Sequence, residues 1–250
     1  MLKVSVLRAS GDNCIWAISH CDQRCAIVDP GEGEPVLDFL KNNQLELTTI
    51  LVTHYHCDHI GGIPELKIAY PDVRILGPAN EPVPNLTHRL QEGDHIDLLG
   101  TSFVVMDLKG HTPGHIGYFG DKRLFCGDVL FSVGCGQVLD GTMSDMYQSL
   151  LKVSDLPDDT KIYCAHECTE KNITFALMVD PRNKDLIDHW DKISSVRDEL
   201  TLPTTLFLEK RINPFLRVKS EEIIKSVQGR TTDTEGLSVF TALREWKSSL

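Results

Sequence analysis

The chain has 250 residues, of which 41% are hydrophobic and 24% charged, as in a globular protein with one large domain or one domain and a smaller partner. Its net charge of −11 argues against nucleic-acid binding, because contacts to phosphates need a basic face. No apolar run is long enough to cross a membrane. The first eight residues do not resemble a secretory signal, so we expect a cytoplasmic protein in which most of the eight cysteines are reduced.

Short apolar and β-branched runs dominate the first two thirds of the chain and predict strands at 4–7, 25–28, 49–52, 103–106, 123–125 and 161–164. Residues 34–42, 63–70 and 144–151 have the composition of helices. Beyond residue 170 helical periodicity takes over, at 172–179, 184–199, 221–227 and 237–247, with Pro203 and Pro214 as breaks. The pattern predicts a mixed α/β domain over residues 1–166 and a smaller helical domain over 167–250.

Three imidazoles and a carboxylate follow the strand predicted at 49–52, namely His54, His56, Asp58 and His59. In an extended chain, residues two apart point to the same side, so His54, His56 and Asp58 are expected to face one cavity. A turn made easy by Gly61 and Gly62 would carry His59 to the same place. One four-coordinate ion does not need this many ligands from a single loop, whereas two adjacent ions would use them all. A histidine-rich surface turn is the alternative, and it fits this spacing poorly.

Three further candidate ligands follow predicted strands. They are His111 after the run 103–108, Asp128 after 123–125, and His166 after 162–164. Each alone would be a weak signal, because a histidine at a strand end is more often a hydrogen-bonding residue. Together with the histidine loop they place ligands at the ends of four strands, which is how α/β folds build their sites.

With these residues in view, the chain resembles the metallo-β-lactamase superfamily and, within it, the glyoxalase II (hydroxyacylglutathione hydrolase) family. The resemblance covers nearly the whole chain. Its motifs are Asp29-Pro30-Gly31, the H-x-H-x-D-H segment at 54–59, Gly-His-Thr-Pro-Gly-His at 110–115, Phe125-Cys126-Gly127-Asp128, Gly134-Cys135-Gly136, Gly141-Thr142, Ala165-His166-Glu167 and Asn213-Pro214-Phe215-Leu216-Arg217. It implies an α/β (α+β) fold: a four-layer αββα sandwich with an appended C-terminal helical domain.

The resemblance also implies the roles of the ligands. One ion would take His54, His56 and His111, the other would take Asp58, His59 and His166, and Asp128 would bridge both. Zinc is the expected metal, with iron or manganese as alternatives, since donors of this type suit all three. Asp58 and Asp128 are the expected catalytic carboxylates. For His115 we expect a supporting role, with its ring hydrogen-bonded to hold the loop.

The activity implied is hydrolysis of S-lactoylglutathione, and of related 2-hydroxyacyl-glutathione thioesters, to glutathione and D-lactate in methylglyoxal detoxification. Two ions that share a hydroxide at neutral pH suit this reaction. The thiolate leaving group has a parent pKa of about 8.5, so no strong general acid is needed. The expected partner is therefore a small glutathione thioester, with no membrane or nucleic acid, and we expect the protein to be a monomer.

Substrate recognition follows the family less closely. Arg244 and Lys247 match the Arg-x-x-Lys that grips the glycine carboxylate of glutathione, although a solvated helix face would show the same spacing. Where the family usually has a basic residue and then an aromatic one, this chain has Gln137 and Leu139. Cys168 stands where an aromatic residue commonly follows the His-Glu pair. These departures leave open a different thiol carrier.

The sequence is also compatible with other functions. The nearest is another thioesterase of the same fold. A persulfide dioxygenase would share the His and Asp motifs but bind a single iron, and the helical C-terminus with Arg244 and Lys247 disfavours it. A β-lactamase is disfavoured because Asp128 occupies a position where the commonest zinc β-lactamases carry cysteine. A metal-binding module without activity would hold its metal with every coordination position closed.

Overall fold

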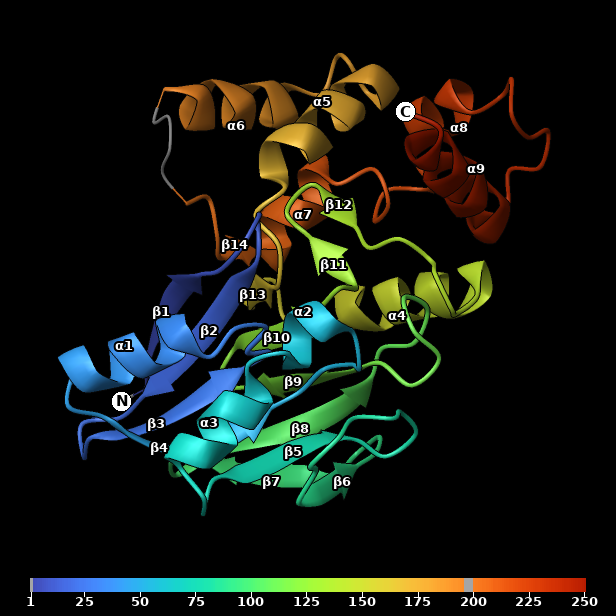
Figure 1. Ribbon diagram of the computed structural model, residues 1–250. Helices are drawn as coiled ribbons and strands as arrows, with labels where there is room; N and C mark the ends of the chain where they lie inside the picture. The colour runs from blue at the N-terminus through green and yellow to red at the C-terminus, as the bar shows by residue number, and fades with distance from the viewer. Residues whose placement is uncertain (1, 196–199) are drawn as a thin grey trace. The chain divides into compact units, whose positions relative to one another are not determined.

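The computed structural model describes residues 2–195 and 200–250 (Figure 1). The chain divides into two compact units. The first contains the residues up to Leu108 and Pro113–Gly127, and the second contains Lys109–Thr112 and Asp128–Leu250. None of the helices in the described ranges has the length and apolarity that a membrane crossing requires.

A six-stranded sheet lies at the centre of the first unit. Its strands are ordered β1 (Lys3–Arg8), β2 (Cys14–Ser19), β3 (Arg24–Val28), β4 (Glu46–Leu51), β5 (Arg74–Pro78) and β6 (His88–Leu90). The pairs from β1 to β3 are antiparallel, and those from β3 to β6 are parallel. The last four residues of β3 are all buried, because layers cover this part of the sheet on both faces. This is why the run from Cys25 to Val28 is continuously apolar.

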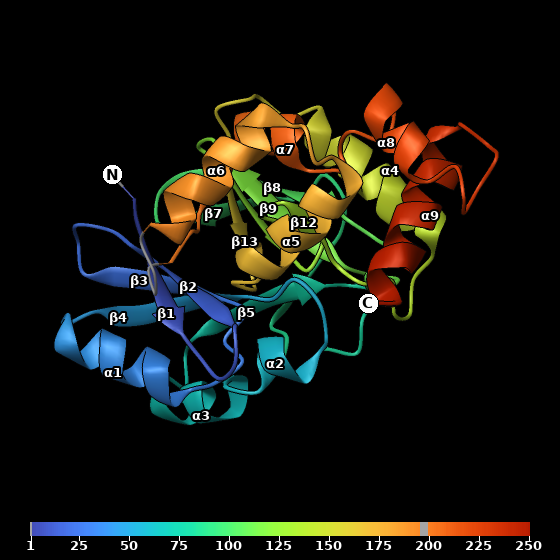
Figure 2. The same cartoon turned by 90° about the horizontal axis from the view of Figure 1, so that it is seen from above.

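Helices cover one face of this sheet, and a second group of strands covers the other (Figures 1 and 2). Helix α1 (Glu34–Asn42) buries Val36 and Leu40, and α3 (Ile63–Ala69) buries Ile63 and Leu66 in the same apolar cluster as the sheet. The second group is antiparallel, in the order β10 (Arg123–Gly127), β9 (Ile116–Gly120), β8 (Thr101–Asp107), β7 (His95–Leu98). Tyr118 of β9 joins the two sheets, since its buried hydroxyl donates to the Val52 carbonyl at 2.6 Å.

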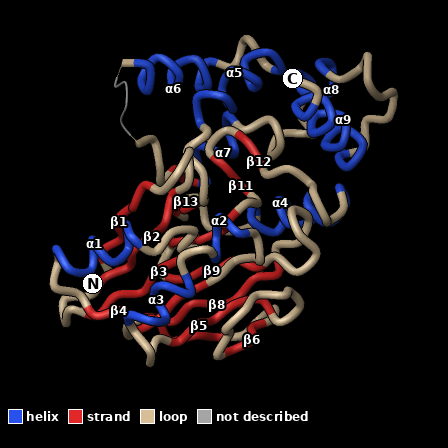
Figure 3. Tube along the Cα trace, in the orientation of Figure 1, coloured by secondary structure: helices blue, strands red, loops and turns tan. Residues whose placement is uncertain are grey.

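The second unit is mainly helical, as the blue segments of Figure 3 show. Its helices are α4 (Met143–Ser154), α5 (Thr169–Val179), α6 (Lys184–Ser194), α7 (Leu206–Ile212), α8 (Glu221–Ser226) and α9 (Gly236–Ser248). Its strands are the hairpin β11 (Leu130–Phe131) and β12 (Gly134–Cys135), and the antiparallel pair β13 (Lys161–Cys164) and β14 (Thr204–Thr205). Ile173, Ala176, Leu186 and Ile212 from α5, α6 and α7 pack around Val133 of the hairpin loop. This cluster ties the helices to the hairpin.

Most expected elements are present, with two kinds of difference. The structure adds strands that the sequence reading missed, among them β2, β5 and β9, and the short helix α7 between Pro203 and Pro214. Thr205 caps α7 by accepting a hydrogen bond from Leu208 N at 3.4 Å. The helix expected over 184–199 is described as α6 up to Ser194, and residues 196–199 lie outside the described ranges.

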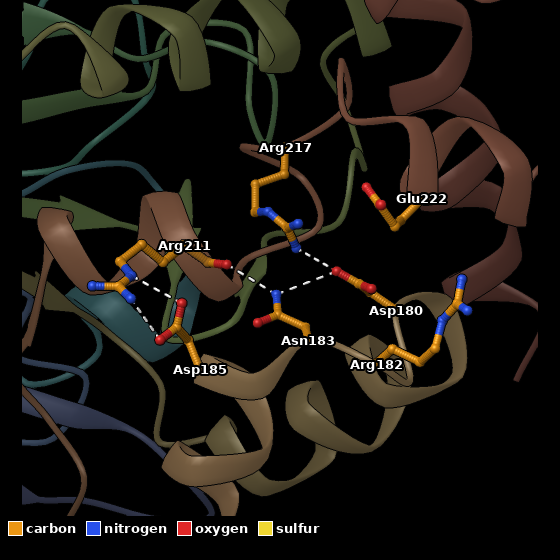
Figure 4. A pocket seen from close by; sticks show the side chains of 7 residues that line it. All are labelled: Asp180, Arg182, Asn183, Asp185, Arg211, Arg217 and Glu222. Atoms are coloured by element: carbon orange, nitrogen blue, oxygen red, sulfur yellow. Dashed lines mark hydrogen bonds and ion pairs between the residues drawn. The ribbon is translucent and has the colours of Figure 1, made fainter.

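A polar depression of about 430 Å³ in the second unit is lined by Asp180, Arg182, Asn183, Asp185, Arg211, Arg217 and Glu222 (Figure 4). Arg217 pairs with the buried Asp180 at 2.6 Å, and Arg211 pairs with Asp185 through two nitrogens at 2.9 and 2.6 Å. The first pair joins the segment after α7 to the end of α5, and the second joins α7 to the first turn of α6. The arginine that ends the Asn213–Arg217 motif is therefore engaged in a structural ion pair.

Glu209 on α7 is the buried acid of the second unit. Its carboxylate accepts hydrogen bonds from Thr204 Oγ1 at 2.7 Å, Val133 N at 2.8 Å and Asn213 Nδ2 at 2.9 Å. Asn213 Nδ2 also reaches the Gly134 carbonyl at 2.9 Å, so the network holds the β11–β12 hairpin against α7. Burial raises the pKa of Glu209 to about 7, although its hydrogen bonds act in the opposite direction.

We predict that Glu209→Gln removes a pH dependence of stability. Because the folded-state pKa is raised from 4.5 to about 7, the folded chain binds the proton more tightly than the unfolded chain. This contribution is complete below pH 4.5 and is lost as the pH rises to about 7. Wild type should lose up to about 3 kcal/mol from this source across that window, while the glutamine variant keeps the acceptor for Val133 without the titration.

Thermal melts followed by circular dichroism at several pH values test this. The exposed Glu245→Gln on α9 is the matched control and should follow wild type. A Glu209→Gln protein whose melting temperature follows wild type across the window would contradict the prediction.

Candidate metal centre

The histidine loop begins where β4 ends. His54 and His59 are buried, whereas the Asp58 side chain is 44% exposed. His56 is the N-cap of α2 (Cys57–Ile60), so the chain turns into a helix at Cys57. The expectation that His54, His56 and Asp58 share one side of an extended segment is therefore wrong for Asp58, which lies on the first turn of α2.

Close backbone packing, rather than unusual dihedral angles, explains the glycines beside this loop. Gly61 and Gly62 have ordinary right-handed helical conformations, so the turn does not use the left-handed freedom of glycine. A Cβ on Gly61 would lie 2.5 Å from the Gly31 carbonyl oxygen, and a Cβ on Gly31 would lie 2.0 Å from the Asp58 carbonyl oxygen. Only glycine lets the segment after β3 approach α2 this closely.

The donor atoms of the first unit lie at ligand spacing. His54 Nε2 is 3.1 Å from His56 Nδ1, the rings of His54 and His59 have centroids 4.0 Å apart, and His59 Nε2 is 3.7 Å from Asp58 Oδ2. Two ligands of one tetrahedral zinc ion, with bonds of about 2.0–2.1 Å, lie about 3.3 Å apart. The loop thus presents three imidazoles and a carboxylate at the separations that metal ligands adopt.

The second unit holds the other three candidate ligands. His111 lies in the segment Lys109–Thr112, Asp128 follows β10, and His166 follows β13. One oxygen of Asp128, Oδ2, is 3.4 Å from His111 Nε2 and 3.3 Å from His166 Nε2. Asp128 is buried, and a buried carboxylate between imidazole nitrogens needs a positive charge nearby, which a metal ion supplies. This donor set therefore fits a divalent metal.

Outer contacts of Nδ1 indicate which nitrogen His54, His59 and His111 offer to a metal. Asp29 accepts from Thr53 N and Thr53 Oγ1, both at 2.8 Å, so the Thr53 hydroxyl must accept from His54 Nδ1, 3.0 Å away. Asp29 Oδ2 is also 3.2 Å from His59 Nδ1. In the second unit, His111 Nδ1 donates to the Gln137 carbonyl at 2.7 Å. In each of these contacts Nδ1 faces the outer partner, so Nε2 is the nitrogen turned toward the other candidate ligands.

Asp29 is a candidate functional residue that the sequence pattern does not identify. It stands in the Asp29-Pro30-Gly31 motif, and nothing in its local sequence indicates a role. Its carboxylate orients His59 directly and His54 through Thr53. Its φ of 51°, unusual for a residue other than glycine, was not visible in the sequence.

His115 lies against the same loop. Its buried ring stacks on His54 with centroids 4.8 Å apart and an interplanar angle of 24°. Gly127, with a φ of +48°, makes room for it, because a Cβ there would lie 2.7 Å from His115 Nε2 and 2.4 Å from Thr53 Oγ1. The structure places His115 against His54, and the hydrogen-bonded supporting role expected for it stays a prediction.

The residues expected to contact substrate lie in the second unit. Arg244 is buried and donates to the Cys135 carbonyl at 3.0 Å, so it does not belong to a solvated helix face. Lys247 Nζ donates to Asn172 Oδ1, and Asn172 Nδ2 lies 3.2 Å from Cys168 Sγ. Gln137 and Leu139 are exposed in the loop after β12. The structure therefore brings Lys247 and Cys168 to the same asparagine.

Known proteins show clear similarity to this chain. A family profile described as "Metallo-beta-lactamase superfamily" matches residues 13–166, and one described as "Hydroxyacylglutathione hydrolase C-terminus" matches residues 167–250. A "Hydroxyacylglutathione hydrolase" of Vibrio parahaemolyticus is 52% identical over 250 residues, with 99% of each chain covered.

Among solved structures, ETHE1 from Myxococcus xanthus aligns with a TM-score of 0.67 at 23% identity, covering 100% of this chain and 99% of that one. TTHA1623 in a di-iron-bound form aligns with a TM-score of 0.61 at 25% identity, covering 84% and 98%. The expected fold is confirmed as that of the metallo-β-lactamases, with a helical C-terminal region. Together with the clustered His and Asp donors, this match shows that the chain binds metal ions.

We predict that Asp29→Asn weakens metal binding without displacing a ligand. The amide cannot accept from Thr53 and orient His59 as the carboxylate does, and loss of such a partner typically costs 10- to 100-fold in metal affinity. Competition with a chromophoric chelator measures the affinity. Asp38→Asn, an exposed carboxylate on α1 of the same unit, is the control and should bind metal like wild type. Equal affinities for the two variants would refute the role of Asp29.

Proposed function

The chain belongs to the hydroxyacylglutathione hydrolase family of the metallo-β-lactamase superfamily, and we propose that it hydrolyses S-lactoylglutathione, and related 2-hydroxyacyl-glutathione thioesters, to glutathione and D-lactate. In a cell this reaction would belong to methylglyoxal detoxification. The observation that carries the proposal is that every ligand position of the family is filled in a chain that matches a named relative along its full length.

The proposal assigns two divalent ions to seven residues. His54, His56 and His111 would hold one ion, Asp58, His59 and His166 would hold the other, and Asp128 would contribute to both. The spacing of donors within each unit supports this assignment, above all the placing of Asp128 Oδ2 within 3.4 Å of both His111 and His166. Zinc is the proposed metal, with iron or manganese as alternatives, because imidazole and carboxylate donors suit all three.

The divalent ions would supply a water-derived nucleophile near neutral pH and a positive charge for the oxyanion of the thioester. The residues of the chain hold the metal ligands in place and orient the nucleophile. Asp29 and Thr53 hold His54 and His59 with Nε2 turned away from the Thr53–Asp29 pair. The Asp58 side chain is far more exposed than that of Asp128, 44% against 9%, so Asp58 is the carboxylate better placed to orient the nucleophile or take its proton. The thiolate leaves without a strong general acid, since its parent pKa is about 8.5.

Recognition of the substrate is assigned to the second unit, with residues 167–250 as the substrate-binding region. Lys247 is the proposed partner of the glycine carboxylate of glutathione, and its half-buried ammonium lies beside Phe175 and Phe215. The buried Arg244 holds α9 to the β12 segment and adds positive charge behind Lys247. Gln137, Leu139 and Cys168 replace the polar and aromatic contacts usual in the family, so we propose weaker contacts along the rest of glutathione.

The proposal extends to a monomer in the cytoplasm. None of the eight cysteines, all of which lie in the described ranges, forms a disulfide, as suits a reducing compartment. The net charge of −11 supports a small-molecule partner over a nucleic acid.

The direct test is hydrolysis of S-lactoylglutathione by purified protein, with metal content measured on the same sample. We expect turnover that a chelator abolishes and about two metals per chain. Two bound metals without turnover would retain the metal site and reject the substrate. A single iron with oxygen uptake on a persulfide would overturn the proposal in favour of a dioxygenase.

Asp128→Ala should remove the second metal and nearly all activity. The variant leaves His111 and His166 without the carboxylate that both approach, so we expect a fall in kcat of at least about a thousandfold, as when a group central to transition-state charge is lost. Elemental analysis and kinetics on the same preparation make the comparison. Asp188→Ala, an exposed carboxylate on α6, is the control. Retention of both metals by Asp128→Ala would refute the bridging assignment.

A further inference from the structure

The ammonium of Lys247 has a defined place although it ends a flexible side chain. Lys247 Nζ donates to Asn172 Oδ1, across from α9 to α5. It also lies over the rings of Phe175 at 5.8 Å and Phe215 at 5.7 Å. A lysine side chain loses considerable rotamer entropy when it is held, so a fixed acceptor is needed to keep the charge in one position.

Asn172 is built to be that acceptor. Its side chain is 2% exposed, and its Nδ2 donates to the Ser132 carbonyl at 2.8 Å and to Cys168 Sγ at 3.2 Å. The partners decide the orientation of the amide, because an ammonium only donates and a carbonyl only accepts. Oδ1 must therefore face Lys247, and Nδ2 must face Ser132.

The hairpin makes room for this amide. A Cβ on Gly134 would lie 2.5 Å from Asn172 Nδ2, so the first glycine of the Gly-Cys-Gly motif is needed for Asn172 to approach. The amide is thus fixed from the β11–β12 hairpin, from the start of α5 and from α9. A side chain held on three sides can position the group that it binds.

Asn172 is uncharged, and this matters because the group that it holds, the Lys247 ammonium, carries a positive charge. The pKa of Lys247 is lowered to about 8, chiefly by burial and also by Arg244, while Cys135 and Cys168 act in the opposite direction. An aspartate at 172 would neutralise the ammonium in an internal ion pair. An amide oxygen orients the ammonium and leaves its charge available to an anion from outside.

We propose that Asn172 is a positioning residue, which holds the Lys247 ammonium uncompensated for the terminal carboxylate of the thiol carrier. The inference rests on the proposed function, and it assigns to Asn172 the preference for a carrier that ends in a carboxylate. Cys168 contributes as the second acceptor of the Asn172 amide. Substitution of Asn172 should raise KM and leave kcat close to wild type, since the carboxylate lies far from the bond that breaks.

Binding of two non-hydrolysable ligands to the metal-loaded protein tests this. One is S-hexylglutathione, and the other is the same thioether with its glycine carboxylate amidated. The quantity of interest is the ratio of the two Kd values from calorimetry. Wild type should prefer the carboxylate, and Asn172→Ala should reduce the preference about tenfold. Asn172→Asp, which keeps the volume of the side chain but neutralises Lys247, should reduce it as well. Lys171→Ala, an exposed cation on α5, is the control.

A double-mutant cycle separates positioning from structural damage. Lys247→Met should abolish the preference, and adding Asn172→Ala to it should cause no further loss. Weaker binding of both ligands by the same factor in the Asn172 variants would indicate damage to the fold and overturn the inference. An unchanged ratio in both variants would overturn it too. A wild-type protein that binds neither ligand would overturn the proposed function itself, and one that binds both equally would overturn the role of Lys247.

Discussion

The histidine loop depends on the buried carboxylate of Asp29. This side chain accepts hydrogen bonds from the backbone N–H and the hydroxyl of Thr53 and faces His59 Nδ1. One residue directly after β3 therefore orients ligands that follow β4. β3 and β4 are paired in parallel, with Val28 opposite Leu51, so their ends lie side by side. The apolar core beneath these strands therefore sets the geometry of the metal ligands. A carboxylate that is 4% exposed and accepts two hydrogen bonds from Thr53 has few alternative positions.

Buried polar side chains also fix the position of a segment in the second unit, the β11–β12 hairpin. Glu209 and Asn213 hold the β11–β12 hairpin from α7, and Asn172 holds it from α5. Each of them binds backbone groups of a segment that has little regular structure of its own. Such groups are costly when unsatisfied, so a network that satisfies them all specifies one arrangement. The hairpin in turn provides Cys135, whose carbonyl accepts from Arg244 on α9.

Two of the residues that depart from the family pattern make hydrogen bonds in the structure. Cys168 stands where an aromatic residue is usual, and its sulfur accepts a hydrogen bond from Asn172. Gln137 is exposed, yet its carbonyl fixes the His111 ring. Backbone groups of the loop after β12 therefore remain useful to the metal centre while its side chains vary. The geometry of the metal ligands is maintained by main-chain and buried contacts, and it is therefore independent of the side chains assigned to substrate recognition.

The sequence by itself determined the ligand types, the positions of most helices and of six strands, and the family, because these depend on local spacing and on periodic apolar residues. His54, His56, Asp58 and His59 were identifiable from their density after one apolar run. Only the tertiary structure showed that Asp58 lies on a helix and that Asp29 orients two histidines. It also showed that Arg244 is buried while Asn172 holds Lys247. The contacts of Asp29, Arg244 and Lys247 join residues 24 to 109 positions apart, and local pattern contains no information on which distant groups will meet.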